Sequence, residues 1–236
     1  RGEQWTRTLQ AYAGPVSGTM DGALIETAHS MRVLDPVWHT KAETASRLRG
    51  RVEAILDWAT VHRYRTGDNP ARWKGHLEAL LPARSKVSKA KHFAALPWRD
   101  MKPFMAELRK QNGIGALALQ FTILTAARSG EVRGMEWYEV DFEQRLWTVP
   151  GERMKAGREH RVPLSNAAVE LLEQLKAVKL ADTETVFPSV RDHKPLSDMT
   201  LTAVLRRMQR GDITVHGLRS SFRDWAAEAT DYPQEM

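Results

Sequence analysis

Three short stretches of this 236-residue chain contain side chains that could bind a phosphate group. In the first, TAARSGE, Arg128 follows a run of apolar residues, so rigid structure should hold its guanidinium group. A guanidinium group is planar and can bind phosphate oxygens through two parallel hydrogen bonds. Glu131, three residues later, could orient it. The same pattern also fits an arginine at a helix end that only pairs with a glutamate.

The second stretch, His216-Gly-Leu-Arg219, places an imidazole and a guanidinium on one helix face, because residues three apart are neighbours there. Arg223 falls on the same side one turn later. Free backbone N–H groups at a helix N-terminus would add to the attraction for an anion, although a solvated helix face has the same composition. The third stretch contains Lys155 in a predicted hairpin turn, where most lysines only face solvent.

Helical periodicity dominates the elements that must position these residues. The first part of the chain reads as helices over 5–12, 23–34, 44–65 and 73–81. The helix over 44–65 should bury one stripe of side chains, made up of Leu48, Val52, Ile55, Leu56 and Ala59.

The second part mixes helices with strands. It should contain helices from Met101 (capped by Asp100), over 115–127, from Asn166, over 201–208 and from Thr214. Strands over 146–149 and 161–164 should form a hairpin. The last helix should bury a stripe of Leu218, Phe222, Trp225 and Ala229. The expected fold class is mainly α with a small antiparallel β-sheet, that is, an all-α domain followed by an α+β domain.

An arginine, then a lysine in a hairpin, then His-x-x-Arg, in this order, form a recognisable set. The sequence resembles the tyrosine recombinases, and within them the integrases of prophages and genomic islands. The stretches TAARSGEVRGMEW, RMKAGREHRVPLS and GDITVHGLRSSFRDWAAE carry the resemblance. ETASRLRGRVEAILDWA resembles the family's helical core-binding domain. The resemblance covers essentially the whole chain.

The resemblance implies a role for each residue of the set. Arg128 and Arg219 would clamp the scissile phosphate, Lys155 would protonate the departing 5′ oxygen, and His216 would help to remove the proton of a tyrosine nucleophile. Glu131 would support the site by orienting these groups. Pre-placed cations suit this reaction because its transition state gains negative charge on the phosphate oxygens.

The resemblance implies no cofactor and no metal, because a phosphotyrosyl bond conserves the energy of the broken linkage. The sequence agrees with this, since it contains no HExxH and no GxxxxGK[ST] motif. The family's nucleophilic tyrosine follows the His-x-x-Arg helix after a His or Trp, and we expect both beyond Met236. Tyr232 follows Arg219 by 13 residues in an Asp-Tyr-Pro sequence typical of a turn, so we do not expect it to be the nucleophile.

The resemblance also gives the domain organisation. We expect a helical, SAM-like core-binding domain over 1–83, a basic linker over 84–91, and a catalytic domain over 92–236 that is truncated before its His/Trp and Tyr positions. No small N-terminal arm-binding domain is visible either. The expectation is a fragment that binds DNA but does not cleave it.

The net positive charge of the chain comes from its first part. The formal net charge is +6 and the isoelectric point is about 9.7. Residues up to Lys91 contain 15 Lys and Arg against nine Asp and Glu, and the remainder contains 20 of each. A basic module joined to a neutral one fits a protein that holds a polyanion with its first part, and it equally fits a charge excess that only keeps the protein in solution. The candidate DNA contacts are Arg47, Arg49, Arg51, Lys86, Lys89, Lys91 and Arg223.

The expected partners are double-stranded attachment sites, three further protomers in a homotetramer on DNA, and accessory DNA-bending proteins, with the fragment alone a monomer. Cysteine is absent, and no apolar run is long enough to span a membrane. A bacterial cytoplasmic location at the nucleoid fits these features. Two alternatives remain: a non-catalytic DNA-binding regulator of the same fold, and a type IB topoisomerase with similar pocket chemistry.

Overall fold

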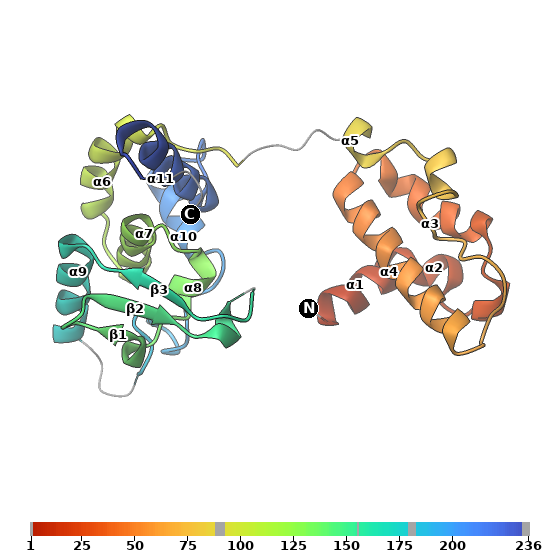
Figure 1. The fold of residues 1–236 in the computed structure, drawn as a ribbon, viewed down its shortest axis with the longest axis horizontal. Helices are drawn as coiled ribbons and strands as arrows, with labels where there is room; N and C mark the ends of the chain where they lie inside the picture. The colour runs from red at the N-terminus through yellow and green to blue at the C-terminus, as the bar shows by residue number, and fades with distance from the viewer. Residues whose placement is uncertain (1, 88–92, 155, 179–182, 233–236) are drawn as a thin grey trace. The chain divides into compact units, whose positions relative to one another are not determined.

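The computed structural model describes residues 2–87, 93–154, 156–178 and 183–232 and divides the chain into two compact units, Arg1–Lys91 and His92–Met236 (Figure 1). The predicted sites at Lys89, Lys91 and Lys155 lie outside the described residues. Each unit has its own apolar core.

The described part of the first unit is helical. Its elements are α1 (Gly2–Tyr12), α2 (Gly14–Ser17), η1 (Gly22–Leu24), α3 (Thr27–Trp38), α4 (Ala42–Val61), η2 (Leu77–Ala79) and α5 (Arg84–Val87). The core forms where α3 packs against α4, and Trp38 is its largest buried side chain. The Trp38 ring stacks on Trp73 with centroids 5.4 Å apart, and its Nε1 donates a hydrogen bond to the Pro82 carbonyl oxygen.

Two expectations for the first unit need correction. The helix predicted over 73–81 is only the single turn η2, because Gly75 adopts a positive φ that ends any regular helix there. Ile55, expected in the buried stripe of α4, is exposed, whereas its neighbour Leu56 is buried. α5 lies at the start of the segment predicted as a linker, and its Val87 packs against the core of the first unit; the linker over 84–91 stays a prediction.

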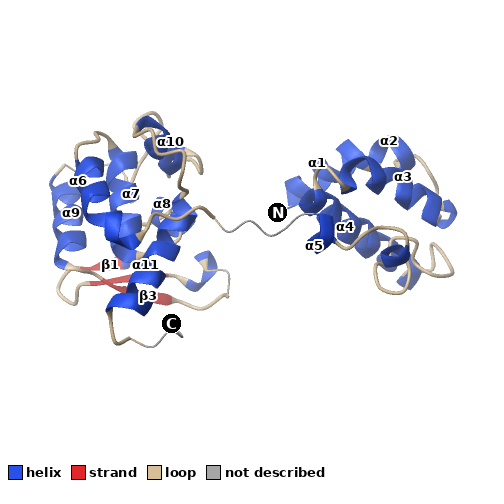
Figure 2. Ribbon diagram, turned by 90° about the horizontal axis from the view of Figure 1, so that it is seen from above, coloured by secondary structure: helices blue, strands red, loops and turns tan. Residues whose placement is uncertain are grey.

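The second unit combines helices with a small sheet (Figure 2). Its elements are η3 (Trp98–Asp100), α6 (Met101–Arg109), α7 (Ile114–Thr125), α8 (Ser129–Arg133), η4 (Trp137–Glu139), β1 (Val140–Asp141), β2 (Leu146–Val149), η5 (Gly151–Arg153), β3 (His160–Pro163), α9 (Asn166–Ala177), α10 (Thr200–Arg207) and α11 (Val215–Ala229). The strands form an antiparallel sheet in the order β1-β2-β3, with Trp147 opposite Val162. Mainly helical structure with a small antiparallel sheet is the fold class expected from the sequence.

α7 is the central helix of the second unit. It is apolar nearly all round and contacts α6, α8, α9, α10 and α11 (Figure 1). Phe121 of α7 is fully buried and packs against Trp147 of β2 and Phe187. Since α7 is held on all sides, the residues at its end are attached to the most rigid part of the unit. Asp100 stands before α6 as expected, but its side chain makes no capping hydrogen bond.

Candidate active site

Arg128 stands at the corner between α7 and α8. α7 ends because Ala126 adopts a left-handed conformation, with φ +49°, and Arg128 then precedes α8 in an extended conformation. The Glu131 carboxylate accepts hydrogen bonds from the backbone N–H of Arg128 at 2.9 Å and from its guanidinium Nη1 at 2.6 Å. The side chain of Glu131 is 7% exposed and that of Arg128 is 51% exposed. A fixed carboxylate therefore holds the guanidinium at the surface.

Arg219 of α11 lies close enough to Arg128 and Glu131 to respond to both charges. Burial lowers the pKa of Arg219, repulsion from Arg128 lowers it further, and Glu131 partly offsets these effects. The Nη1 atom of Arg219 is buried and has no hydrogen-bond partner among the described residues. Two guanidinium groups beside one carboxylate leave a net positive charge, and a phosphate oxygen would satisfy the free donor.

The start of α11 fixes His216 and Arg219 relative to the chain segment that follows residue 92. The Thr214 side chain caps the helix by accepting a hydrogen bond from the Gly217 N–H at 2.9 Å. The Ala94 carbonyl oxygen in turn accepts the backbone N–H of Thr214 at 3.0 Å. His216 is exposed, and its ring centroid lies 4.4 Å from that of Phe93. This contact orients the imidazole on the first turn of α11, three residues before Arg219.

The connection between β2 and β3 holds the predicted Lys155, and its described part is tightly closed. A Cβ atom added to Gly151 would lie 2.9 Å from the Gly157 carbonyl oxygen, so the two ends of the turn approach as only glycine allows. Met154 packs against the core. Lys155 itself is outside the described residues, so its placement with Arg128 and Arg219 stays a prediction.

Arg153, two residues before Lys155, was not recognised from the sequence. Its guanidinium donates to the backbone carbonyl oxygen of Glu131 and to the carboxylate of Glu139. The other oxygen of Glu139 accepts the indole N–H of Trp147 at 2.9 Å. No spacing rule marks this arginine, because its partners come from segments that only the fold brings together.

Of the three arginines of α4 expected to contact DNA, two are engaged inside the first unit. Arg49 donates to Glu53 at 2.6 Å and to the Ala71 carbonyl oxygen at 2.9 Å. Arg51 is 8% exposed and packs over the Trp5 ring. Arg47 is 61% exposed and pairs only with the exposed Glu43 among the described ion pairs. A DNA contact by α4 therefore depends mainly on Arg47.

The remaining candidate cations are at the surface. Lys86 is exposed on α5, and its neighbour Arg84 shares the Glu43 carboxylate with Arg47. Arg223 lies one turn after Arg219 on α11, is 76% exposed and pairs with the adjacent Asp224 at 3.2 Å. Contacts of Lys86 and Arg223 with DNA remain predictions.

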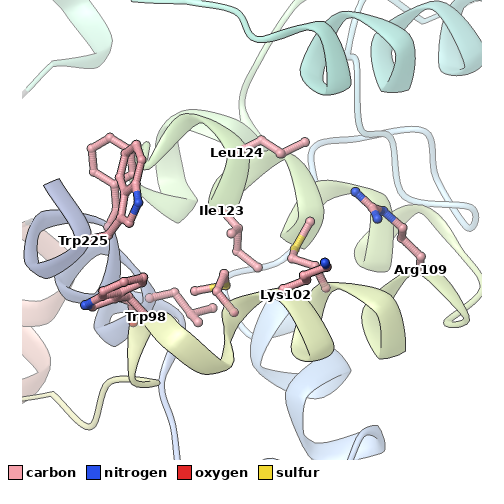
Figure 3. Close-up of a pocket in the computed structure, with 11 residues that line it drawn as sticks. Trp98, Lys102, Arg109, Ile123, Leu124 and Trp225 are labelled. Carbon is pink, nitrogen blue, oxygen red and sulfur yellow. The ribbon is translucent and has the colours of Figure 1, made fainter. Parts of the chain in front are cut away.

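The buried stripe expected on α11 is wrong in its second half. Leu218 is buried, but Phe222 is 42% exposed and Trp225 is 38% exposed. Both line an open groove of about 440 Å³ between α6, α7 and α11. Figure 3 shows Trp98 and Trp225 at one end of this groove and Arg109 at the other. The last turn of α11 is tied to the segment after residue 92 through Glu228, which accepts the indole N–H of Trp98 at 2.9 Å, while Phe222 and Trp225 line the groove.

No group of His, Asp and Glu side chains among the described residues could hold a metal ion. No helix in the described ranges is both long and apolar enough to cross a membrane.

Comparisons with known proteins show the family of this chain. The model described as "Phage integrase central domain" matches residues 1–76, and the model described as "Phage integrase family" matches residues 96–231. The integrase of Enterobacteria phage P4 is 32% identical over 242 residues, which cover 94% of this chain and 53% of that protein. Prophage integrase IntZ of Escherichia coli K12 is 31% identical over 98% of this chain and 56% of its own length. The chain thus spans about half the length of the curated relatives it matches.

Solved structures share the fold at low sequence identity. A lambda integrase dimer bound to a COC′ core site has a TM-score of 0.69 at 19% identity, covering 97% of this chain and 80% of that one. The Tn1549 transposon integrase in complex with circular intermediate DNA has a TM-score of 0.73 at 12% identity, covering 99% and 83%. With family models that match both units, this chain belongs to the phage integrase family of tyrosine recombinases.

Proposed function

We propose that this chain is part of an enzyme that integrates or excises a prophage or genomic island by site-specific DNA recombination. The observation that carries the proposal is the pair of guanidinium groups at the end of α7 and the start of α11. Arg219 is desolvated, has a buried free donor and lies beside a second cation, Arg128, which Glu131 holds in place. Such a pair is suited to a phosphodiester.

In the proposed reaction a tyrosine hydroxyl attacks the scissile phosphorus. The phosphorus–5′-oxygen bond breaks, and a 3′-phosphotyrosyl bond forms in its place. Arg128 and Arg219 stabilise the negative charge that develops on the non-bridging oxygens. His216 takes up the tyrosine proton, and Lys155 gives a proton to the 5′ oxygen. The phosphotyrosyl bond conserves the energy of the broken phosphodiester bond. A 5′-hydroxyl from another duplex can therefore attack it, release the tyrosine and reseal the DNA.

The proposed organisation assigns DNA binding to the first unit and chemistry to the second. Residues 1–83 would form the core-binding domain, and residues 92–236 would contribute the cations of the catalytic pocket. The lambda integrase has been solved as a tetramer bound to a Holliday junction. By analogy we propose four protomers on two double-stranded attachment sites, with accessory DNA-bending proteins as further partners.

A covalent-trapping assay tests this function. The probe is a nicked suicide duplex from the boundary between the integrated element and the host chromosome, so that a cleaved strand end is lost and cannot be resealed. The assay compares the complete gene product, its Arg128→Ala variant, an Arg161→Ala control in the same unit, and the 236-residue chain alone. We expect an adduct with the complete product and the control, and a loss of at least about a hundredfold in Arg128→Ala.

The other outcomes are equally informative. An adduct from the 236-residue chain that disappears in Tyr232→Phe would make Tyr232 the nucleophile, against our expectation. Tight, salt-sensitive DNA binding without an adduct from any form would contradict the enzymatic proposal and favour a DNA-binding regulator. Relaxation of supercoiled DNA without pairing of sites would instead identify a topoisomerase.

A further inference from the structure

Arg153 connects three elements of the second unit through one side chain. It lies at the end of η5, where the β2–β3 connection begins. Its guanidinium donates to the Glu131 carbonyl oxygen of α8 and to the Glu139 carboxylate of η4. The side chain of Glu139 is 1% exposed and that of Arg153 is 25% exposed. A buried carboxylate with two donors, Arg153 and Trp147, anchors the guanidinium firmly.

The contact with α8 meets a specific need of that helix. α8 has five residues, and the last four carbonyl groups of a helix lack partners within the helix. The Glu131 carbonyl is one of these, and the Arg153 guanidinium satisfies it. A Cβ atom on Gly134 would lie 3.4 Å from Nη2 of Arg153, which is ordinary van der Waals contact, so the arginine passes close to the end of α8.

The residue that Arg153 holds by its backbone is the one that orients Arg128 by its side chain. The Glu131 carboxylate accepts both the backbone N–H and the guanidinium of Arg128. A shift of the Glu131 backbone would therefore move Arg128. Since α8 is a short helix, few other hydrogen bonds within it oppose such a shift.

We propose that Arg153 is a positioning residue, which locks α8 so that Glu131 keeps the Arg128 guanidinium in place for the phosphate. The inference rests on the proposed function, because the role of Arg128 does. Arg153 itself touches no reacting atom in this scheme. It acts through the Glu131 backbone, and the same side chain ties the start of the β2–β3 connection to α8.

A plain Arg153→Met variant would leave the buried Glu139 charge without its cation and could unfold the unit. The informative variant is Arg153→Met with Glu139→Gln, in which the glutamine still accepts the Trp147 indole N–H. This double variant removes both members of the buried ion pair together with the link to α8, so that no uncompensated charge stays buried. Arg153→Lys is the conservative companion, because it keeps the charge but lacks a planar fork. The matched control is Arg161→Gln, which replaces an exposed arginine of β3.

The first readout is hydrogen exchange in the 236-residue chain, which does not depend on catalysis. We expect the amide of Arg128, which donates to Glu131, to exchange about tenfold faster in the double variant at an unchanged melting temperature. Arg161→Gln should exchange like the parent chain, and Arg153→Lys should lie in between. Unchanged exchange at Arg128 in the double variant would overturn the proposal.

The second readout is single-turnover cleavage of the suicide duplex by the complete gene product. The double variant should bind DNA within about twofold of the parent but cleave about ten- to a hundredfold more slowly. A bridging 5′-sulfur at the scissile bond leaves without protonation, so it should not restore the rate. Restoration by sulfur would place the defect in leaving-group protonation and contradict a role through Arg128. If the parent makes no adduct, the proposed function fails, and hydrogen exchange alone decides the inference.

Discussion

Arg219 is a partly buried cation of the candidate site, and its charge lowers the stability of the folded state. Its pKa is lowered chiefly by burial and then by Arg128, so folding disfavours its charged form. At neutral pH the side chain must nevertheless be charged, because the ordinary pKa of arginine lies far above 7. The folded state therefore carries a cost that an anion would relieve. Functional sites commonly show perturbed ionisable groups of this kind.

We predict that Arg219→Met raises the melting temperature by up to about 4 °C while cleavage falls by at least about a thousandfold. The stabilisation arises because the neutral side chain removes both the desolvation cost and the repulsion from Arg128. Thermal unfolding and the trapping assay measure the two effects. Arg223→Met, which removes an exposed arginine on the same helix, is the control and should leave the melting temperature unchanged. A lower melting temperature in Arg219→Met would mean that the charge stabilises the fold.

Arg128, Arg219 and Glu131 can be singled out as candidates from the sequence, whereas Arg153 cannot. The first three lie in short motifs, where the spacing along a helix indicates which side chains can contact each other. The 2.6 Å hydrogen bond from Arg128 to Glu131 is such a contact, between residues three positions apart. Arg153 reaches a carbonyl 22 residues away, across the sheet connection. Such a contact depends on the packing of η5 against α8, which no periodicity encodes.

Elements with long apolar patterns were predicted well, and elements of one turn were not. The predicted helix over 115–127 corresponds to α7, and the predicted strands over 146–149 and 161–164 correspond to β2 and β3. α8 was missed, and the helix predicted over 73–81 was wrong. A single turn has too few internal hydrogen bonds to form by propensity, so tertiary partners decide its existence.

The start of α11 depends on an unusually close backbone approach. A Cβ atom on Gly217 would lie 2.0 Å from the Ala94 carbonyl oxygen, which is also hydrogen-bonded to Thr214. The close approach keeps the segment after residue 92 against the helix, and with it Phe93 against His216. This position needs glycine because a side chain would not fit. Its backbone conformation is not the reason, since its φ is not in the left-handed region.

We predict that Gly217→Ala lowers the free energy of unfolding of the second unit by about 1–3 kcal/mol, because overpacking must push the two segments apart. Denaturant unfolding followed by tryptophan fluorescence would measure this. Gly130→Ala is the matched control: it is also helical, its nearest neighbour is a flexible arginine 3.9 Å away, and it should be neutral or slightly stabilising. Equal effects of the two substitutions would show that the approach at Ala94 is not constraining.

At the scale of the whole chain, the composition indicates which part has a net positive charge, but it does not indicate which cations are free to bind a phosphate. The excess of Lys and Arg falls within the first 91 residues. Yet Arg49 and Arg51 are held by Glu53, by backbone carbonyl oxygens and by the Trp73 and Trp5 rings. An arginine stem can cover an aromatic ring as readily as it can reach a phosphate, so composition cannot separate the two uses.

The salt dependence of DNA binding distinguishes arginines that bind phosphate from arginines that pack inside the protein. Each cation that neutralises a phosphate adds about 0.9 to the slope of log affinity against log salt. Because Arg47 is exposed and shares only Glu43, we predict that Arg47→Ala lowers the slope of the 236-residue chain on duplex DNA by about 0.9. Arg49→Ala should lower the melting temperature instead and leave the slope unchanged.

Arg72→Ala, which removes an exposed arginine paired with Asp68, controls for net charge. Equal slopes for Arg47→Ala and the parent would remove α4 from the proposed DNA-binding surface and leave α5, with Lys86, to hold the phosphates.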